Sequence, residues 1–380
     1  MRIGLICLDS LPCPPIKSGA IELLIDRVAP YLVSTYDHVT VFSIQDPSLS
    51  NRETINHVEF IRFQRSKYLK EVLRYLENNF FDLIQVYNKP DWIFPIKKAS
   101  PGSRLVLSLH NLILGNRVDD QVSQQAVDVV DHIVTVSQFV ARDVVHRYPA
   151  APGKITTIYT GDDHSLYTPH YSSLGSQIEL RMKRAMGIPD DYLVILFVGR
   201  LIPKKGCHIL IEAMKKVGEQ HPKTALVIIG SKWYGEFSDN EYVKKIKKKS
   251  QKISEHIYFN NFISVNEITD YYTMSDILVC PSQWKEPLAR VHYEAMAAGI
   301  PIVTTNRGGN SEVIVNGKNG YVIDQYDQAQ AFVAAINKLL DSKRLREKMG
   351  YRNRKLIKNR YNFKRYALHL SKLYKELKVL

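Results

Sequence analysis

The sequence predicts an α/β protein with two doubly wound, parallel-sheet domains, and three observations support this class. The chain has 380 residues, more than the ~250–300 at which one hydrophobic core usually divides. Short β-rich runs alternate with helical stretches in the first half of the chain, and the same alternation starts again in the second half. Several runs, such as residues 83–86 and 105–109, are almost continuously apolar, which is typical of parallel strands covered on both faces.

The first half of the chain contains strand signals with helical patterns between them. Residues 20–32 and 66–78 have the apolar spacing of helices that cover a sheet. The expected strands of this half span residues 2–8, 38–44, 58–63, 82–87, 104–110, 132–136 and 154–159.

A polar, irregular stretch from Gly161 to about Asp191 separates the two halves. It is interpreted as an inter-domain linker with one helix around residues 177–186. Two successive arrays of strand and helix imply two facing sheets with a central cleft, because each open parallel sheet binds ligands at its carboxyl edge. The second half has expected strands at 193–198, 225–229, 256–259, 277–280, 301–304 and 321–323, and helices at 206–219, 240–250, 287–298, 328–340 and 343–380, the last interrupted around 361–363.

The composition is ordinary for a soluble globular protein, with 45% apolar and 24% charged residues. Cys7, Cys13, Cys207 and Cys280 are scattered, which favours reduced thiols over disulfides or a zinc site. No segment approaches the ~18 continuous apolar residues of a membrane span, and the apolar start of the chain is too short for a signal peptide. We therefore expect a cytoplasmic protein, with a membrane surface as an alternative place.

Positive charge is concentrated in two segments of a chain whose net charge is +14. Residues 341–380 contain 14 Lys or Arg against three acids, and residues 244–249 contain five lysines. These runs are either solvated helix faces or surfaces that attract an anionic membrane or a polyanionic acceptor. We expect no nucleic-acid partner, because no helix-turn-helix signature, zinc finger or RNP-type motif accompanies the charge.

Two glutamates, Glu286 and Glu294, lie eight residues apart, and Pro287 favours a helix that begins between them. Eight helical residues rise ~12 Å, about the span of a diphosphate and its flanking sugars. On this interpretation each glutamate binds hydroxyls at one end of a nucleotide sugar, and the N–H groups near Leu288 and Ala289 bind the phosphates. The alternative is a pair of surface glutamates on a helix.

Two cations, Arg200 and Lys205, follow the expected strand 193–198 in the loop before a helix. A planar guanidinium and an ammonium at the carboxyl end of a strand suit a leaving diphosphate. The alternative is surface charge on a loop, which Gly199 and Gly206 make less attractive, because glycine lets a backbone approach a phosphate closely.

Three further segments follow expected strands. Gly19, after residues 17–18, enters a helix through a turn of small residues, which is a common anion seat. His110 ends a strand and can hydrogen-bond donor hydroxyls. Gly308 and Gly309 allow a ligand to approach closely. The alternative for the glycines is a simple turn. The alternative for His110 is a side chain that only hydrogen-bonds the backbone at the end of its strand.

In order and spacing these motifs resemble those of the retaining glycosyltransferases of the large family 4, which have the GT-B fold, and the resemblance covers the whole chain. The segments that carry it are residues 199–206, the Glu286 and Glu294 pair, and residues 308–312. Within the family the chain is most similar to the spore coat protein SA type, on residues 230–233, 272–276 and 283–299.

The resemblance also implies a division of labour. An acceptor-binding domain would span residues 1–165 and a donor-binding domain residues 166–362, with a last helix at about 363–380 packing back on the first. For the individual residues, Arg200 and Lys205 would bind the diphosphate, Glu294 the ribose hydroxyls and Glu286 the transferred sugar, with His110 beside that sugar and Gly19 bordering the phosphates.

Two positions depart from the family pattern. Family members often have a glycine pair where this chain has Ser18 before Gly19, and many have Phe-Gly where it has Leu288 and Ala289. Arg290 follows directly and would place an extra cation near the donor, where it can alter donor choice.

The expected reaction moves a hexose-type sugar from a nucleoside diphosphate sugar to a carbohydrate or glycoconjugate acceptor, with retention, in coat or cell-surface polysaccharide biosynthesis. The chain contains no Asp-x-Asp motif, so neither a metal nor a cofactor is expected. The resemblance implies no covalent enzyme intermediate. The alternatives are a catalytically silent component of a spore coat, and a nucleotide-sugar hydrolase or epimerase.

Overall fold

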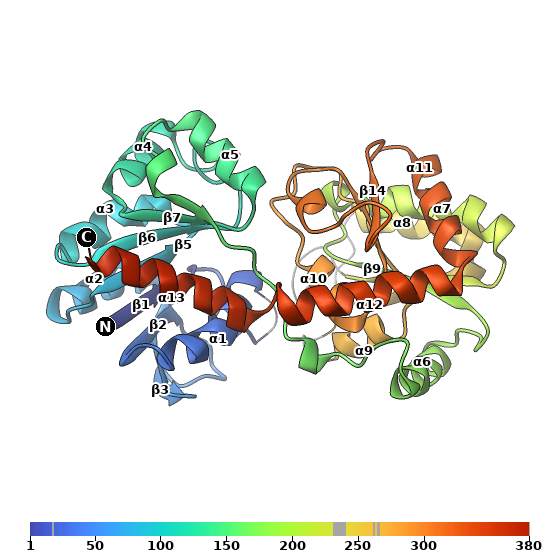
Figure 1. Cartoon of the computed structure of the whole chain (residues 1–380), viewed down its shortest axis with the longest axis horizontal. Coiled ribbons are helices and arrows are strands. Elements are labelled where there is room, and N and C mark those ends of the chain that lie inside the picture. Colours follow the sequence, from blue (N-terminus) through green and yellow to red (C-terminus); the bar gives the residue numbers. More distant parts are fainter. Residues whose placement is uncertain (17–18, 231–240, 261–262, 264–266, 380) are drawn as a thin grey trace. The chain divides into compact units, whose positions relative to one another are not determined.

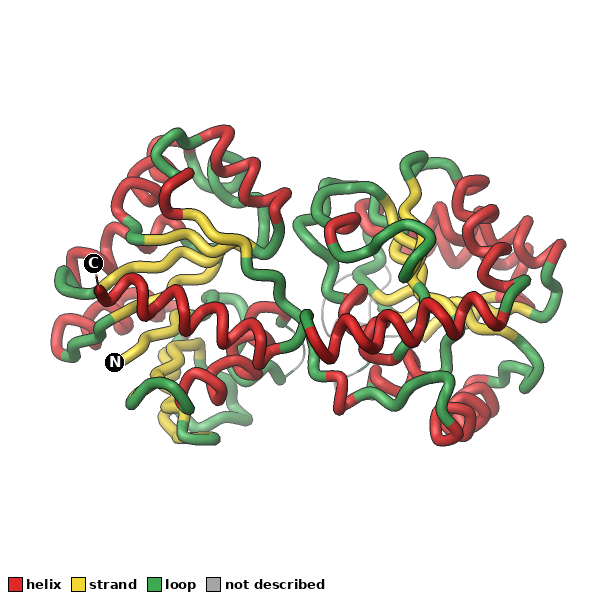
Figure 2. The backbone as a smooth tube through the Cα atoms, viewed as in Figure 1, coloured by secondary structure: helices red, strands yellow, loops and turns green. Residues whose placement is uncertain are grey.

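The computed structural model describes residues 1–16, 19–230, 241–260, 263 and 267–379 (Figure 1). Residues 17–18 of the predicted anion seat, and residues 231–233 of the segment 230–233, lie outside this described part. The chain forms two compact units, Met1–Thr160 with Phe363–Leu380, and Gly161–Asn362. Each unit has its own sheet, and strands lie between helices in both (Figure 2). The predicted α/β class with two sheets is confirmed.

The described part of the first unit contains an eight-stranded sheet in the order β3-β4-β2-β1-β5-β6-β7-β8. Its neighbouring strands are parallel except β3 and β4, which are antiparallel. The strands are β1 (Arg2–Ile6), β2 (His38–Ile44), β3 (Arg52–Ile55), β4 (Val58–Phe63), β5 (Leu83–Tyr87), β6 (Arg104–Leu109), β7 (His132–Thr135) and β8 (Ile155–Thr157), and the helices are α1 (Ala20–Val33), α2 (Tyr68–Asn78), α3 (Ile93–Ala99), α4 (Asp120–Val129), α5 (Gln138–Arg147) and α13 (Phe363–Val379).

The antiparallel edge strand β3 was not predicted. It pairs with β4 through a two-residue turn in which Asn56 and His57 both have positive φ, 51° and 63°. Such a turn matches the right-handed twist of a hairpin, and asparagine is favoured in it. Asn56 therefore indicated a hairpin turn, which the spacing of apolar residues alone does not reveal.

Helix α13 belongs to the core of the first unit although it comes last in the chain. It contacts α1, and its Tyr366, Leu370 and Tyr374 are almost fully buried. The hydroxyl of Tyr36, just beyond α1, donates a 2.8 Å hydrogen bond to the carbonyl of Ser371. The helix thus completes one face of the first sheet.

The described part of the second unit contains a six-stranded parallel sheet in the order β11-β10-β9-β12-β13-β14. Residues of β10 and β12 are buried throughout, as expected for central strands covered on both faces. The strands are β9 (Leu193–Val198), β10 (Thr224–Ile229), β11 (Ile257–Asn260), β12 (Ile277–Cys280), β13 (Ile302–Thr305) and β14 (Gly320–Ile323), and the helices are α6 (Ser173–Met186), α7 (Cys207–Gln220), α8 (Glu241–Ser250), α9 (Ile268–Thr273), α10 (Val291–Ala298), α11 (Ala329–Leu340) and α12 (Lys343–Asn359).

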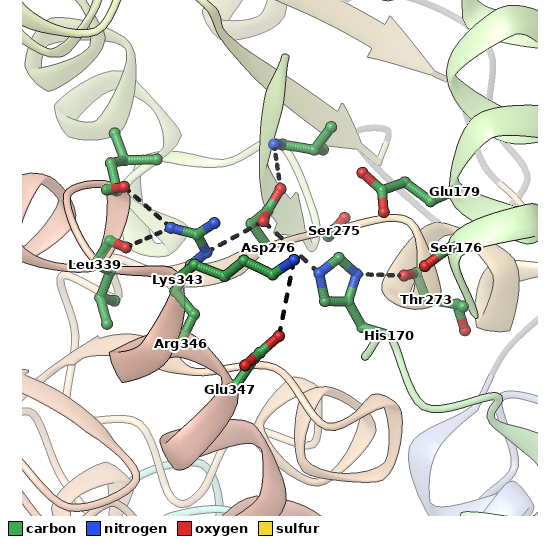
Figure 3. Close-up of polar contacts among 12 residues, drawn as sticks. His170, Ser176, Glu179, Thr273, Ser275, Asp276, Leu339, Lys343, Arg346 and Glu347 are labelled. Carbon is green, nitrogen blue, oxygen red and sulfur yellow. Dashed lines mark hydrogen bonds and ion pairs between the residues drawn. The ribbon is translucent and has the colours of Figure 1, made fainter. Parts of the chain in front are cut away.

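A buried carboxylate, Asp276, ties several elements of the second unit together at the start of β12 (Figure 3). One oxygen accepts a 2.9 Å hydrogen bond from the Val194 N–H of β9. The other lies 3.2 Å from Nε of Arg346 on α12 and 3.7 Å from Nε2 of His170. Arg346 also donates to the carbonyls that end α11. One side chain therefore joins β9, β12 and α12 on the amino side of the sheet.

We expect Asp276→Ala to lower the free energy of unfolding of the second unit by about 3 kcal/mol, because it leaves the buried Arg346 cation without its partner. Urea denaturation of the full chain measures this. Asp341→Ala is the control, since its carboxylate is exposed and its loss should change stability by less than about 0.5 kcal/mol. Equal effects of the two substitutions would show that the buried network does not stabilise the fold.

Candidate active site

Lys205 and Glu286 come from two separate sequence motifs, and the structure brings them together. Lys205 lies in the short 3₁₀ helix Pro203–Lys205 after β9, and Glu286 lies in the loop after β12. The Lys205 ammonium is 2.7 Å from one Glu286 oxygen and 2.9 Å from the other. Arg200 precedes Lys205 in the same loop and is partly exposed. The carboxyl ends of β9 and β12 thus carry two cations and a carboxylate.

The Glu286 carboxylate is buried, and most of its hydrogen bonds go to one of its two oxygens, Oε2. Besides Lys205 it accepts a 2.8 Å hydrogen bond from the Ser282 hydroxyl and a 2.7 Å hydrogen bond from the Trp284 indole. Burial raises the pKa of Glu286, but the Lys205 charge and these hydrogen bonds outweigh it, so the pKa lies below its usual value. Glu286 is therefore an ionised acceptor in a fixed position.

The prediction that a helix begins at Pro287 is wrong. Helix α10 begins at Val291. Leu288 and Ala289 are buried in the preceding loop, and the Ala289 N–H donates to Oδ1 of Asn310 at 3.3 Å. A tertiary contact thus takes the N–H that was expected to bind phosphate, and the ~12 Å helical spacing assumed between the two glutamates does not apply.

The glycine turn that holds this loop has a structural reason. Gly308 has φ +70°, and a Cβ there would lie 1.9 Å from the Glu286 carbonyl oxygen. The Gly309 N–H donates a 2.8 Å hydrogen bond to the same oxygen. The glycine pair was predicted to leave room for a ligand. The nearest neighbour of a Cβ at Gly308 would be the backbone of Glu286, and the close approach of a ligand to the pair stays a prediction.

A second charged cluster surrounds Glu294, in the first turn of α10. Arg290 lies 3.5 Å from Glu294 and 2.7 Å from Asp162. The Tyr272 hydroxyl donates a 2.5 Å hydrogen bond to Glu294. In the structure Arg290 bridges two carboxylates, and its place as an extra cation near the donor stays a prediction. The structure therefore gives Arg290 a role in orienting Glu294.

Asp162 is the residue of this cluster that the sequence did not single out. Its pKa is raised to about 6, mainly by burial; the Arg290 charge opposes the rise and the Glu294 charge adds to it. The sequence signal was weak, because Asp162 stands in a polar stretch that was interpreted as linker. Ser282, Trp284 and Tyr272 were likewise not assigned as site residues.

In the first unit, His110 follows β6 at the carboxyl edge of the sheet. Nε2 of the His110 ring lies 3.1 Å from the Ser108 hydroxyl. The backbone N–H of His110 donates a 2.7 Å hydrogen bond to Oδ1 of Asn88. Asn88 follows β5 and has φ +53°, an uncommon conformation that clusters at functional sites. His110 is thus held in place by two neighbouring strand ends.

Gly19, at the start of α1, has φ +145°, a conformation that favours glycine. A Cβ there would lie 2.5 Å from Oε2 of Glu22. Glu22 is 2% exposed, and burial raises its pKa to about 7. Nothing in the sequence distinguishes this carboxyl, because a glutamate in the first turn of a helix is common. Any anion at Gly19 lies close to it.

The described residues contain no group of three or more metal-ligating side chains. None of the helices in the described part of the chain is long and apolar enough to cross a membrane.

Residues 179–356 match the family described as glycosyl transferases group 1, and residues 21–166 match glycosyltransferase family 4. The spore coat protein SA of Bacillus subtilis (strain 168) is 39% identical over 377 residues, which cover 99% of this chain and 100% of that relative. The chain belongs to the GT-B glycosyltransferases of this family. The putative glycosyltransferase YtcC of the same organism is 40% identical over 378 residues, 99% of this chain and 92% of that relative.

Solved glycosyltransferases share this fold. Anabaena Alr3699/HepE, in complex with UDP, has a TM-score of 0.80 at 20% identity and covers 99% of this chain and 100% of its own. Sucrose-phosphate synthase from Thermosynechococcus elongatus has a TM-score of 0.79 at 20% identity and covers 100% of this chain and 99% of its own. The family resemblance and the GT-B fold predicted from the sequence are confirmed.

Asp162 generates a prediction about pH. Its folded pKa of about 6 lies above the ~3.9 of an unfolded aspartate. A raised carboxyl pKa contributes stability that is present below pH ~4 and is lost as the pH rises through ~6. Relative to Asp162→Asn, the wild-type free energy of unfolding should therefore fall by on the order of 3 kcal/mol between pH ~4 and pH ~7.

Urea titrations of both proteins across this pH range measure the difference. Asp163→Asn, in the same loop, controls for the introduction of an amide. A difference between wild type and Asp162→Asn that stays constant across the range would contradict the raised pKa.

Proposed function

We propose that this glycosyltransferase moves a hexose-type sugar, with retention of configuration, from a nucleoside diphosphate sugar to a carbohydrate or glycoconjugate acceptor. The position of the Lys205–Glu286 pair carries the proposal. In the second sheet β9 and β12 are neighbours, and the chain winds outward from them in opposite directions. Ligands of doubly wound folds bind at the carboxyl ends of the strands at such a point, and Lys205 and Glu286 follow these two strands.

A diphosphate at this point would meet the cations that its departure requires. Negative charge develops on the leaving diphosphate, and Arg200 and Lys205 supply fixed positive charge against it. An ammonium has three N–H donors, so Lys205 can contact a phosphate oxygen while it remains paired with Glu286. Because Arg200 and Lys205 offer positive charge to the diphosphate, we also propose that transfer is metal-independent.

The two glutamates serve opposite ends of the donor in this proposal. Glu286, ionised and positioned by Gly309, accepts hydrogen bonds from hydroxyls of the transferred sugar. Glu294, oriented by Arg290 and Tyr272, accepts those of the ribose. Neutral hydroxyl donors suit both carboxylates.

In this proposal the hydroxyl of the sugar acceptor gives its proton to the leaving diphosphate. As the bond from the anomeric carbon to the diphosphate oxygen breaks, a leaving-group oxygen takes that proton while the new glycosidic bond forms on the same face. No enzyme nucleophile is required. Exclusion of water then limits hydrolysis of the donor.

The relatives support a nucleotide-sugar donor without selecting the nucleotide. Alr3699/HepE has been solved with UDP-glucose. A Mycolicibacterium smegmatis relative, 26% identical over 290 residues, is named as a GDP-mannose-dependent mannosyltransferase. The name of this mannosyltransferase, which specifies phosphatidylinositol monomannoside, that of the Salmonella typhimurium lipopolysaccharide 1,2-N-acetylglucosaminetransferase and that of spore coat protein SA support a role in coat or cell-surface glycan synthesis.

A catalytically silent component of a spore coat is the second candidate. The observation that favours it is the name of the 39% identical relative, spore coat protein SA. In that case the second unit binds a nucleotide sugar or nothing, and no sugar is transferred.

We expect one nucleoside diphosphate from a panel to raise the melting temperature by several degrees in the presence of a chelator, because a ligand that binds only the folded state stabilises it. Glu294→Gln should abolish the shift. Lys338→Gln, whose cation lies over the Tyr321 ring away from the cluster, serves as the control and should keep it. If no nucleotide stabilises the wild type, the donor site is wrong. A shift that needs a divalent metal rules out metal independence.

We expect Lys205→Met to lower kcat at least about 100-fold, because it removes a charge that stabilises the leaving diphosphate. The adjacent Lys204→Met should change kcat by less than about threefold, since the ion pair to Glu286 is made by Lys205. Turnover with the donor identified above measures both, and NMR of the product gives its anomeric configuration. An inverted product would exclude the retaining mechanism, and donor binding without turnover would favour the silent coat component.

A further inference from the structure

Helix α12 presents a charged face that the proposed reaction does not use. Its buried residues lie on one side, and Arg344, Lys348, Arg352 and Lys355 lie exposed on the opposite side. These four positions are three or four residues apart, so they form one line along the helix. Figure 1 shows α12 running along the surface of the second unit.

The line is long and almost purely cationic. Lys358 extends it, and from Arg344 to Lys358 the helix rises ~21 Å. Glu347 is the only acid among the described residues of α12, and it pairs with Lys343 at 4.0 Å. A straight row of cations of this length fits an extended anionic surface better than one small ligand.

Two exposed apolar side chains lie on α12 itself and on an element that contacts it. Tyr351 is 56% exposed within the row, and its ring packs on Tyr171 with centroids 3.8 Å apart. Leu166, 48% exposed, belongs to the 3₁₀ helix His164–Leu166, which contacts α12. A tyrosine ring with one apolar and one wet side suits the headgroup boundary of a bilayer. A soluble polyanion would give these groups no apolar partner.

We propose that the exposed face of α12 docks the protein on an anionic lipid surface. The row of cations lies against the headgroups, and Tyr351 and Leu166 reach the boundary of the acyl region. Attachment is peripheral, through the second unit. It would hold the enzyme where lipid-linked or surface glycans are built.

The test is co-sedimentation of the full chain with vesicles. The protein should bind phosphatidylcholine vesicles that contain about one third phosphatidylglycerol, and should not bind phosphatidylcholine alone. Binding should fall steeply between ~50 and ~500 mM salt, because the contacts are screened. Absence of binding to the anionic vesicles, or equal binding to both kinds, overturns the proposal.

Two charge-matched variants locate the surface. Replacing Arg344, Lys348, Arg352 and Lys355 with glutamine should weaken binding at least about tenfold. The control replaces four exposed lysines of α8, a helix of the same unit, and should weaken it less than about twofold. If the two variants lose binding equally, net charge rather than α12 is responsible. The lysines replaced in the control are Lys244, Lys245, Lys248 and Lys249.

Tyr351→Ser separates a membrane from a soluble polyanion. It should weaken vesicle binding severalfold at the higher salt concentration, where apolar contact contributes most, and leave binding to inorganic polyphosphate unchanged. Wild-type protein that binds polyphosphate but not anionic vesicles would replace the lipid with a soluble polyanion. The α12 variant should keep the wild-type melting temperature and its shift with nucleotide, so a failure of docking is distinguishable from a failure of the proposed reaction.

Discussion

The ion pair between Lys205 and Glu286 is the interaction on which the candidate active site depends. A buried carboxylate is costly unless a cation and hydrogen-bond donors compensate it. Here the ammonium and two side-chain donors do so. The pair also connects the loop after β9 to the loop after β12. The carboxyl ends of these two neighbouring strands are therefore held together by one ion pair. Any ligand that enters there finds its cation and its acceptor already in place.

Backbone contacts also fix the position of Glu286. Gly308 can approach the Glu286 carbonyl because it has no Cβ, and Gly309 donates to that oxygen. The Glu286 carbonyl and the Ala289 N–H both bond to the neighbouring turn and not within a helix. Helix α10 begins only after them, at Val291.

The cluster of Asp162, Arg290 and Glu294 follows a different principle. One guanidinium lies between two carboxylates, and burial raises the pKa of one of them, Asp162. Arg290 therefore contributes orientation to Glu294 as well as charge. Asp276 plays a purely structural part on the other side of the same sheet, where its two oxygens join three elements. In the second unit one group of buried charges thus orients Glu294, and another joins strands and a helix of the fold.

The sequence by itself determined the fold class, the central strands, the loops that carry Arg200, Lys205 and Glu286, and the helix that carries Glu294. It could do so because apolar runs and glycine-bounded loops are local signals. The family followed from motif order over the whole chain. The edge strand β3 was overlooked, although Asn56 offered a local turn signal.

Only the tertiary structure decided which charges meet. Lys205 and Glu286 are 81 residues apart, and Arg290 and Asp162 are 128 apart, so neither partnership has a local signature. The same holds for the start of α10, where Pro287 signals a helix but contacts from Asn310 and Gly309 prevail. Burial, too, is a property of the packed molecule, and it alone distinguishes Asp162 and Glu22 from ordinary surface acids. Local chemistry thus predicted which residue types the site contains, whereas packing decided their partners and their protonation.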